Sequence, residues 1–235
     1  MSPEQSLLAL VDNLQSHIGW LKETGHTGMP VIATEVPPVS PDSGTKEKAL
    51  LEIAYRMETT AVCPLQRTAT RIVPGQGNPN ADLMFIGEGP GADEDRVGMA
   101  FVGRAGQLLT KIVEAMGMTR EEVWIGNIVK WRPPENRTPL PEEIEACMPY
   151  LREQIAVIDP RVIVCLGTTA TKGLLDAQAG ITRLRGTWLS FDGIDVMPTY
   201  HPAYLLRNPL GKRQVWEDMQ SVLARLGRDV PPRKN

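Results

Sequence analysis

Polar side chains suited to binding and hydrolysis follow four short apolar runs of the sequence. The run at residues 83–86 leads directly into a glycine loop with carboxylates, Gly87-Glu88-Gly89-Pro90-Gly91-Ala92-Asp93-Glu94-Asp95. The other three runs end at Asn127, at Gly167-Thr168-Thr169 and at Tyr200-His201-Pro202. Carboxylates, an amide, hydroxyls and an imidazole together suit a site that binds a polar heterocycle and hydrolyses a bond attached to it.

The elements that must position these side chains are predicted to form one parallel sheet. The strand candidates are residues 83–86, 123–128, 162–166 and 194–199, and the helix candidates are residues 105–116, 141–158, 168–175 and 213–226. Strands that alternate with helices indicate βαβ units, and ligands of such sheets bind beyond the carboxyl ends of the strands. We therefore predict an α/β fold, a three-layer αβα sandwich around a central, mainly parallel four-stranded sheet.

Four segments are predicted along the chain. Residues 1–23 place apolar side chains at spacings of three and four, which predicts an amphipathic helix. Residues 24–44 are rich in Pro, Gly and Ser and have no periodicity, which is typical of a linker. Residues 45–228 are expected to form the α/β domain, and residues 229–235 a C-terminal tail.

Composition excludes several classes of protein. The chain has 235 residues, 42% of them hydrophobic and 23% charged, with a formal net charge of −3. It contains no apolar run of the roughly 18 residues that a membrane span needs, so we expect no membrane association. Three cysteines form no secreted disulfide framework and the N-terminus lacks signal-peptide features, which indicates a cytoplasmic, intracellular protein. The C-terminal quarter is basic, but charge alone does not predict a nucleic-acid partner.

Each candidate site residue also has a structural interpretation. The glycine loop superficially matches a dinucleotide-binding fingerprint, but its third glycine is misplaced, a proline interrupts it, and its carboxylates would repel a pyrophosphate. The loop could equally be a plain turn. Asn127 suits a capping role, His201 a structural hydrogen bond, and Phe101 the core. Their occurrence together at one sheet edge favours a functional site.

These motifs resemble those of the family 4 uracil-DNA glycosylases. The resemblance covers roughly residues 60–227, in order and at the family's spacing. The matching segments are Gly87 through Asp95, Gly98, Phe101-Val102-Gly103, Ala105-Gly106-Gln107-Leu108-Leu109, Asn127-Ile128-Val129-Lys130, Arg132-Pro133-Pro134, Asn136-Arg137 and His201-Pro202-Ala203-Tyr204-Leu205-Leu206-Arg207. The resemblance implies a monofunctional base-excision-repair enzyme that flips uracil out of DNA and hydrolyses its N-glycosidic bond, leaving an abasic site. It also implies that uracil-containing DNA is the partner, and we expect a monomer.

The resemblance assigns catalytic roles to two residues. Glu88 would position or activate the attacking water or stabilise the sugar cation, with Glu94 and Asp95 as nearby alternatives. His201 would face uracil O2, where negative charge develops. The residues that would bind the base are Gly87, Gly89, Phe101, which stacks on the ring, and Asn127, which reads its edge.

The resemblance also places residues against DNA. Leu205 falls where such enzymes insert an apolar wedge into the vacated stack, although an ordinary core role is the alternative. Arg207, Arg104 and Lys130 would contact backbone phosphates.

The family's cofactor is not expected in this chain. Family 4 enzymes normally carry a [4Fe–4S] cluster on four cysteines, and the corresponding positions here hold Thr60, Cys63, Trp131 and Cys147. Neither threonine nor tryptophan replaces a soft sulfur ligand, so we predict no cluster and no other metal. We further predict that Trp131 fills the volume of the cluster and that Cys63 and Cys147 lie near one another. Cys165 lies in an apolar run and is expected to be a buried small hydrophobe.

Two other functions remain open at this stage. The missing ligands suit a catalytically weak or silent DNA-binding homologue, although the intact pocket residues argue against it. A glycosylase for another deaminated base, such as hypoxanthine or xanthine, would carry the same motifs. The helix predicted over residues 1–23 could fold back on the domain or bind a repair or replication partner.

Overall fold

The computed structural model describes residues 43–60 and 63–232. The helix predicted over residues 1–23 and most of the predicted linker therefore lie outside the described residues. The described residues belong to one compact unit. Its first helix, α2, begins at Ser43, so the helical segment starts inside the predicted linker range.

Six strands form one mixed sheet. They are β1 (Gln76–Gly77), β2 (Leu83–Gly87), β3 (Trp124–Asn127), β4 (Val162–Leu166), β5 (Leu189–Phe191) and β6 (Ile194–Thr199), in the spatial order β1-β3-β2-β4-β6-β5. The four inner strands are mutually parallel and match the four predicted from sequence. The predicted count of four is corrected by two antiparallel edge strands. With two and three residues, these edge strands are too short to carry a hydrophobic alternation that sequence reasoning could recognise.

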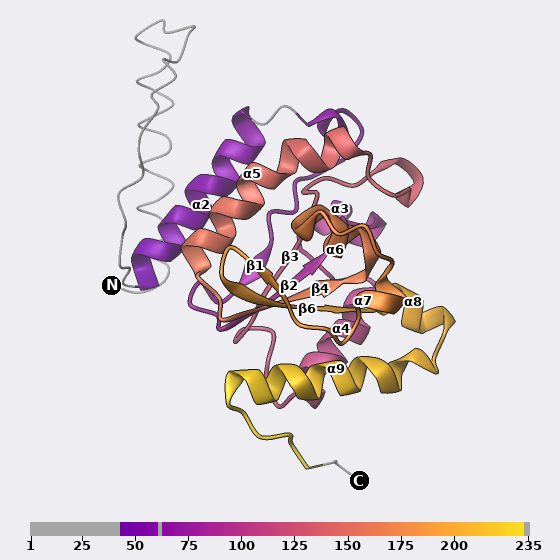
Figure 1. Cartoon of the computed structure of the whole chain (residues 1–235). Coiled ribbons are helices and arrows are strands. Elements are labelled where there is room, and N and C mark those ends of the chain that lie inside the picture. Colours follow the sequence, from indigo (N-terminus) through magenta and orange to yellow (C-terminus); the bar gives the residue numbers. More distant parts are fainter. Residues whose placement is uncertain (1–42, 61–62, 233–235) are drawn as a thin grey trace, which may run out of the picture. The chain divides into compact units, whose positions relative to one another are not determined.

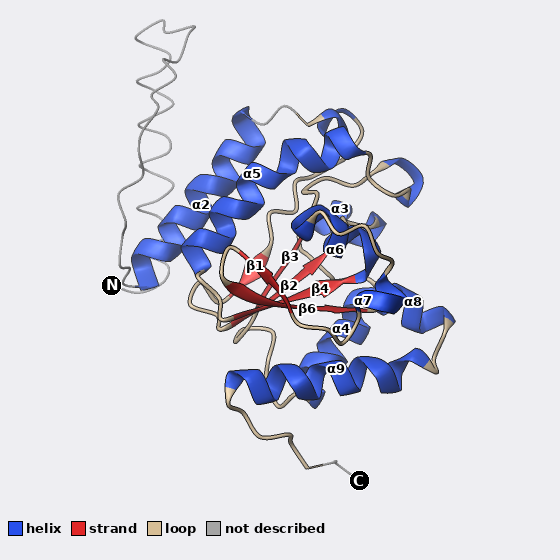
Figure 2. Cartoon of the chain, viewed as in Figure 1, coloured by secondary structure: helices blue, strands red, loops and turns tan. Residues whose placement is uncertain are grey.

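Helices cover both faces of the sheet, which confirms the predicted αβα sandwich (Figure 1; Figure 2). α5 and α6 lie over one face with α2 packed beside α5, and α4 and α9 lie over the other. The helices are α2 (Ser43–Thr60), α3 (Ala92–Val97), α4 (Arg104–Ala115), α5 (Pro141–Ile158), α6 (Gly167–Leu175), α7 (Ile181–Leu184), α8 (Pro202–Arg207) and α9 (Gly211–Leu226), with 3₁₀ turns η1 (Pro64–Arg67) and η2 (Pro134–Asn136). α3, α7 and α8 were not predicted, because helices of four to six residues show no period. No helix among the described residues is long and apolar enough to cross a membrane.

The inner strands are buried on both faces, which explains their continuous apolar sequences. In β2, Met84 and Ile86 join the core under α5 and α6, whereas Leu83 and Phe85 join the core under α4 and α9. Successive side chains of a strand point to opposite faces, so one short run supplies both cores. The sheet is therefore a rigid platform for the loops at its edge.

The strand order creates a crevice at the carboxyl ends of the strands. From β2 the chain passes to β3 on one side, whereas from β4 it continues toward β6 on the other side, so the connections that leave the neighbouring strands β2 and β4 diverge. Open α/β sheets bind ligands at such a divergence. The glycine loop after β2, Asn127 at the end of β3, the start of α6 after β4, and His201 after β6 all reach this edge.

A buried ion pair fixes the last strand to the last helix. Arg185 donates to both carboxylate oxygens of Asp218, at 3.2 and 2.5 Å, and the Thr199 hydroxyl donates to the same carboxylate at 2.6 Å. Burial raises the pKa of Asp218, and the hydrogen bond from Thr199 and the charge of Arg185 oppose that rise. Because Thr199 ends β6, this pair fixes the strand that carries His201 to α9.

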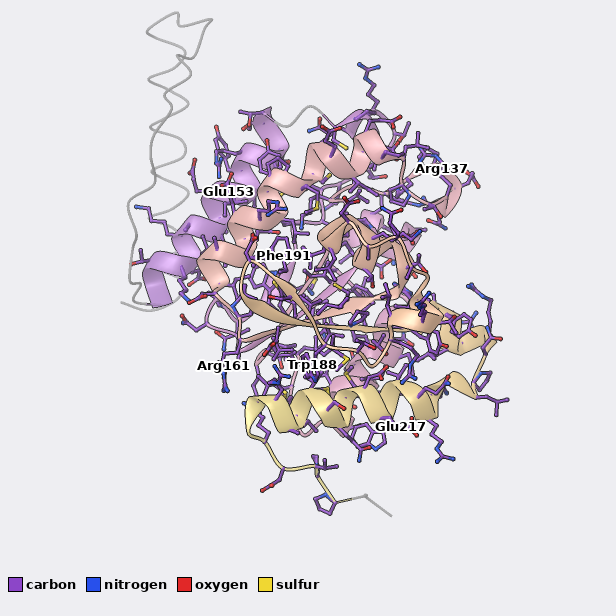
Figure 3. The ribbon with its side chains drawn as sticks, viewed as in Figure 1. Arg137, Glu153, Arg161, Trp188, Phe191 and Glu217 are labelled. Carbon is purple, nitrogen blue, oxygen red and sulfur yellow. The ribbon has the colours of Figure 1, made fainter. Side chains whose placement is uncertain are left out.

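Replacing Asp218 with alanine is expected to lower the free energy of unfolding by about 3 kcal/mol, because it leaves a mostly buried guanidinium and a buried hydroxyl without their acceptor. Denaturant unfolding followed by circular dichroism measures the change. The matched control is Arg213→Ala on the same helix, which removes an exposed pair with Glu217 on the outer side of α9 (Figure 3). An exposed pair contributes little, so equal losses in the two variants would contradict this account.

Candidate active site

A cavity of about 480 Å³ opens at the carboxyl edge of the sheet. Its volume is typical of small-ligand sites. Six residues predicted for the site line it, namely Glu88, Gly89, Phe101, Asn127, His201 and Arg207. Gly87 adjoins the cavity through its contacts with two of these residues. The structure thus brings together the predicted base-binding and catalytic residues from three separate strand ends and from the loop that carries Phe101.

Gly87, Phe101 and Asn127 lie against one another at one corner of the cavity, termed the slot. A Cβ atom on Gly87 would lie 2.5 Å from Asn127 Oδ1 and 2.5 Å from Phe101 Cζ, so only glycine fits. Asn127 is 1% exposed, and its Oδ1 has no hydrogen-bond partner among the described residues. Buried amide oxygens are normally paired, so this one indicates a ligand that donates a hydrogen bond from the cavity.

Phe101 is held in an unusual backbone conformation. Its φ of 54° lies in the left-handed region, which aromatic residues rarely adopt. Arg120 fixes this turn by donating to the carbonyls of Phe101 at 3.1 Å and Ala100 at 2.9 Å. Gly106 allows the close approach, since a Cβ there would lie 1.8 Å from the Phe101 oxygen. The Phe101 ring centroid lies 5.7 Å from that of His201, so both rings border the same space.

Two of the three candidate carboxylates are occupied by backbone. Glu94 accepts from the amides of Val102 at 2.9 Å and Gly103 at 2.8 Å through Oε1, and from Gly91 at 3.1 Å through Oε2. Asp95 accepts from two amides of the segment before β1, at 2.8 and 3.1 Å. Both residues therefore hold loops together. Sequence reasoning gave them only as alternatives for the chemistry and missed these structural roles.

Glu88 and Glu94 both line the cavity, but of these two only Glu94 is bound by backbone amides in the described part of the chain. Glu88 is half-buried, and its Oε2 accepts from the Thr169 hydroxyl at 2.5 Å. Thr169 lies in the first turn of α6, so the threonine pair at the end of β4 contributes by orienting this carboxylate. Glu88 therefore enters the cavity with one oxygen fixed.

His201 is held as a neutral ring. It caps the N-terminus of α8, with its Nδ1 accepting from the Ala203 amide at 3.0 Å. Burial, with a further contribution from the charge of Arg207, lowers the pKa of His201 to about 4. Since Nδ1 is the acceptor, the neutral ring carries its proton on Nε2, which can donate a hydrogen bond.

The predicted wedge position is corrected. Leu205 is 1% exposed and belongs to the core beneath α4 and α9, so it cannot enter a DNA stack in this arrangement. Its neighbours Tyr204 and Leu206 are each 40% exposed. Leu210, between α8 and α9, is more exposed still. The core interpretation of Leu205 is thus the correct one.

One predicted phosphate contact is also corrected. Lys130 is fully buried, and its Nζ donates to the Asn127 carbonyl at 2.9 Å and to Gln154 Oε1 at 2.8 Å. Burial lowers its pKa to about 8. Its side chain turns into the protein after the end of β3, so it does not reach a phosphate. Arg104 and Arg207 are exposed, and their contacts with DNA remain predictions.

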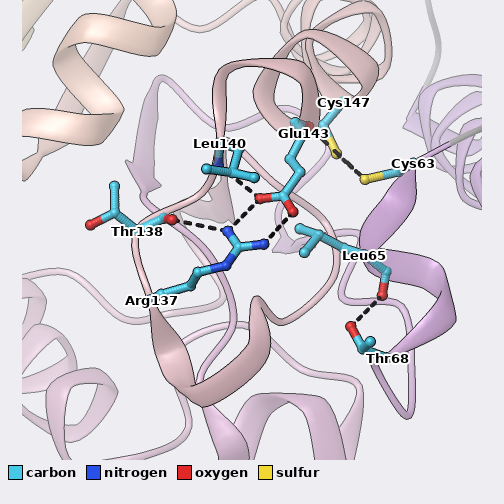
Figure 4. Close-up of polar contacts among 8 residues, drawn as sticks. All are labelled: Cys63, Leu65, Thr68, Arg137, Thr138, Leu140, Glu143 and Cys147. Atoms are coloured by element: carbon cyan, nitrogen blue, oxygen red, sulfur yellow. Dashed lines mark hydrogen bonds and ion pairs between the residues drawn. The ribbon is translucent and has the colours of Figure 1, made fainter.

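The two retained cysteines lie together, as predicted. Cys63 and Cys147 are buried with their sulfurs 3.9 Å apart (Figure 4). Trp131 belongs to the same core cluster, whereas Thr60 is exposed at the end of α2. Two thiols, an indole and a distant hydroxyl do not fit the four-thiolate requirement of a [4Fe–4S] cluster. Among residues 43–60 and 63–232, no group of three or more His, Cys, Asp or Glu could hold a metal ion.

An ion pair next to these cysteines ties the cavity wall to α5. Arg137, which lines the cavity, donates to both oxygens of Glu143 at 2.8 and 2.6 Å (Figure 4). Glu143 also accepts from the Leu140 amide at 2.7 Å, and the Arg137 guanidinium lowers the pKa of Glu143. Sequence reasoning did not single out this pair, although Arg137 lies in a matched motif.

Fold and site together define an α/β protein with an aromatic ring, an amide and an imidazole around one cavity at the carboxyl edge of its sheet. Comparison with known proteins agrees. A model of the uracil DNA glycosylase superfamily matches residues 74–220. Three similar proteins are type-4 uracil-DNA glycosylases. The Thermotoga maritima protein is 46% identical over 76% of this chain and 95% of its own length. The Sulfurisphaera tokodaii protein is 44% identical over 68% and 77%, and the Archaeoglobus fulgidus protein 38% identical over 78% and 96%. The chain therefore belongs to the uracil-DNA glycosylase superfamily.

The imidazole of His201 is expected to titrate near pH 4, as measured by NMR on the resonance that His201→Asn removes. The imidazole binds its second proton more weakly in the folded state than in the unfolded chain, where its pKa is near 6.5. The neutral ring therefore contributes stability above pH 6.5, and this contribution is lost as the pH falls toward 4. The His201→Asn variant keeps a capping side chain but lacks this loss. If both proteins lose equal stability between pH 7 and 4, the neutral-imidazole assignment is wrong.

Proposed function

We propose that this chain is a monofunctional uracil-DNA glycosylase of base excision repair. It flips uracil out of DNA, hydrolyses the N-glycosidic bond and leaves an abasic site. The observation that carries the proposal is the unpartnered amide oxygen of Asn127 in the slot closed by Gly87 and Phe101. Uracil N3–H donates to Asn127 Oδ1 and uracil O4 accepts from its Nδ2, while Phe101 stacks on the ring.

Departure of the base is assisted by a neutral donor. As the C1′–N1 bond breaks, its electron pair passes to uracil, and negative charge builds on O2. His201 Nε2–H donates to this oxygen. Its neutral state at pH 7 follows from burial, and its orientation follows from the Nδ1 bond to the Ala203 amide.

Glu88 completes the hydrolysis. Water attacks C1′ of the sugar and gives its proton to the Glu88 carboxylate, which also stabilises positive charge on the sugar. Thr169 fixes one carboxylate oxygen, so the other is directed to the water. Glu94 is unsuited to this task because three backbone amides occupy its oxygens.

Contacts with uracil-containing DNA involve α8 and its surroundings. Arg207 and Arg104 are exposed and bind backbone phosphates. Leu206, rather than the buried Leu205, provides the apolar wedge, since it is 40% exposed one position further along α8. The protein acts as a monomer.

We further propose that the enzyme works without the iron–sulfur cluster that its type-4 relatives normally carry. Support comes from the donor set, since Trp131 and Thr60 stand at two ligand positions and only Cys63 and Cys147 offer thiols. Trp131 packs in the same core as these cysteines and replaces a metal link by apolar burial.

Uracil release from labelled oligonucleotides, single-stranded or with uracil opposite G or A, tests the activity. Gly87→Ala is expected to reduce the single-turnover rate by about 100-fold or more, because its Cβ collides with the Asn127 amide oxygen and the Phe101 ring and displaces both. The matched control is Gly180→Ala, where a Cβ meets no atom within 4 Å, and it is expected to excise uracil normally.

Glu88→Gln separates chemistry from binding in the same assay, because the amide keeps the size of the side chain but cannot accept the proton. The variant is expected to bind uracil-containing DNA normally and to turn over slowly. A wild-type protein that binds DNA but releases no uracil would overturn the proposal and favour a silent homologue. Release of hypoxanthine or xanthine alone would favour another deaminated base.

Iron analysis and the visible spectrum of freshly purified protein test the cluster-free state. We expect no iron and no broad absorption band at about 400 nm. A content of about four iron atoms per chain would contradict the proposal. Trp131→Ala is expected to lower the free energy of unfolding by about 3 kcal/mol or more, since it opens a cavity in the core. Trp216→Ala is the control, because this half-buried tryptophan leaves a smaller defect.

A further inference from the structure

Lys130 is a buried cation whose position the proposed chemistry leaves unexplained. Its ammonium donates to two neutral acceptors, the Asn127 carbonyl at 2.9 Å and Gln154 Oε1 at 2.8 Å. Removing an ammonium from water is costly, and buried charges are usually paired with carboxylates. Because Lys130 has no carboxylate partner among the described residues, we expect its burial to contribute something other than net stability.

The acceptors of Lys130 lead to the base-reading residue. We propose that Lys130 is a positioning residue that fixes Asn127, an inference that rests on the proposed function. Asn127 ends β3, and the next two amides, of Ile128 and Val129, donate to Gly87 and Glu88 at 2.9 and 3.2 Å. The carbonyl of Asn127 turns to Lys130, so the peptide that carries the amide side chain is held from both directions.

The far end of this network is anchored as well. Gln154, on α5, donates through Nε2 to the Pro74 carbonyl at 2.8 Å, which leaves its Oε1 as the acceptor for Lys130. The backbone of Lys130 accepts from the Val73 amide at 2.8 Å. Hydrogen bonds thus connect Pro74 to Gln154, Gln154 to Lys130, and Lys130 to Asn127. They link the segment before β1 to the slot through α5.

The geometry requires a donor at this position. Asn127 is 1% exposed, so without Lys130 its carbonyl would be a buried acceptor with no partner in the described network. If the Asn127 peptide rotated to bring its carbonyl to another donor, the side-chain amide of Asn127 would change its orientation in the slot. A small displacement of a base-reading group has a large effect on the reaction. Lys130 therefore acts on recognition of the base, whereas a phosphate contact would act on DNA affinity.

The test measures these two effects separately. Binding is measured for oligonucleotides that carry 2′-fluoro-2′-deoxyuridine, which resists hydrolysis, its cytidine counterpart, or a tetrahydrofuran abasic analogue. Cytosine presents the reverse donor and acceptor pattern at positions 3 and 4, so the preference for uracil reports on Asn127. Lys130→Met is expected to lower the preference for uracil by about tenfold and to leave affinity for the abasic analogue unchanged.

Two further variants keep the outcome decisive. Ile155→Ala, in the same core beside Gln154, controls for loss of stability and is expected to retain the uracil preference. Gln154→Met removes the anchor of Lys130 and tests the network if Lys130→Met does not fold, with a smaller loss of preference expected. Weaker binding to the abasic analogue would show a phosphate contact, and an unchanged uracil preference would also overturn the inference. A wild-type protein without any uracil preference would instead overturn the proposed function.

Discussion

The site depends on the absence of a side chain at Gly87. At the end of β2 the backbone passes so close to Asn127 Oδ1 and the Phe101 ring that a single methyl group would collide with both. This close approach packs the Phe101 ring and the Asn127 amide against the backbone of Gly87, so both are held at the wall of the cavity. Asn127 can remain unpaired there only because the rest of the sheet edge is rigid, since an unsatisfied buried oxygen would otherwise favour rearrangement. Binding of a base that donates to this oxygen removes the penalty.

Rigidity around the slot comes from charged groups that take no part in the chemistry. Glu94 joins the glycine loop to the Phe101 loop, and Arg120 holds Phe101 in its left-handed turn. Asp218 fixes the strand that leads to His201. Each of these three charged groups is buried or half-buried and forms several hydrogen bonds. Such an arrangement specifies one conformation but adds little net stability. Glu88 keeps the exposure that its proposed catalytic role needs, because other carboxylates hold the loops together.

Sequence reasoning predicted the parts of the molecule that have a clear period or a motif. The strands around Phe85 and Val164 are buried on both faces, so their apolar runs were unambiguous, and α5 begins at Pro141 as predicted. Placing ligands at strand ends brought Glu88, Asn127 and His201 together correctly. α8 was beyond this approach, because in six residues nothing reveals whether Leu205 or Leu206 faces the core, and adjacent helical residues differ by about 100° in direction. The phosphate contact predicted for Lys130 was wrong for a similar reason. β3 ends three residues before Lys130, so the alternating side-chain directions of a strand no longer indicate which way this lysine points.

The region of the missing cluster ligands shows which contacts would join its segments in the proposed cluster-free protein. A metal cluster on positions 60, 63, 131 and 147 would join the end of α2, η1, the loop after β3 and α5. In this chain these segments still meet, because Cys63, Trp131 and Cys147 share one core with Met57 of α2, and Arg137 with Glu143 joins the loop to α5. Apolar burial and a bidentate ion pair hold the same elements without depending on the oxidation state of thiolates. Since α5 also carries Gln154, the packing around Trp131 supports the residue that anchors Lys130, and through it the base-reading amide.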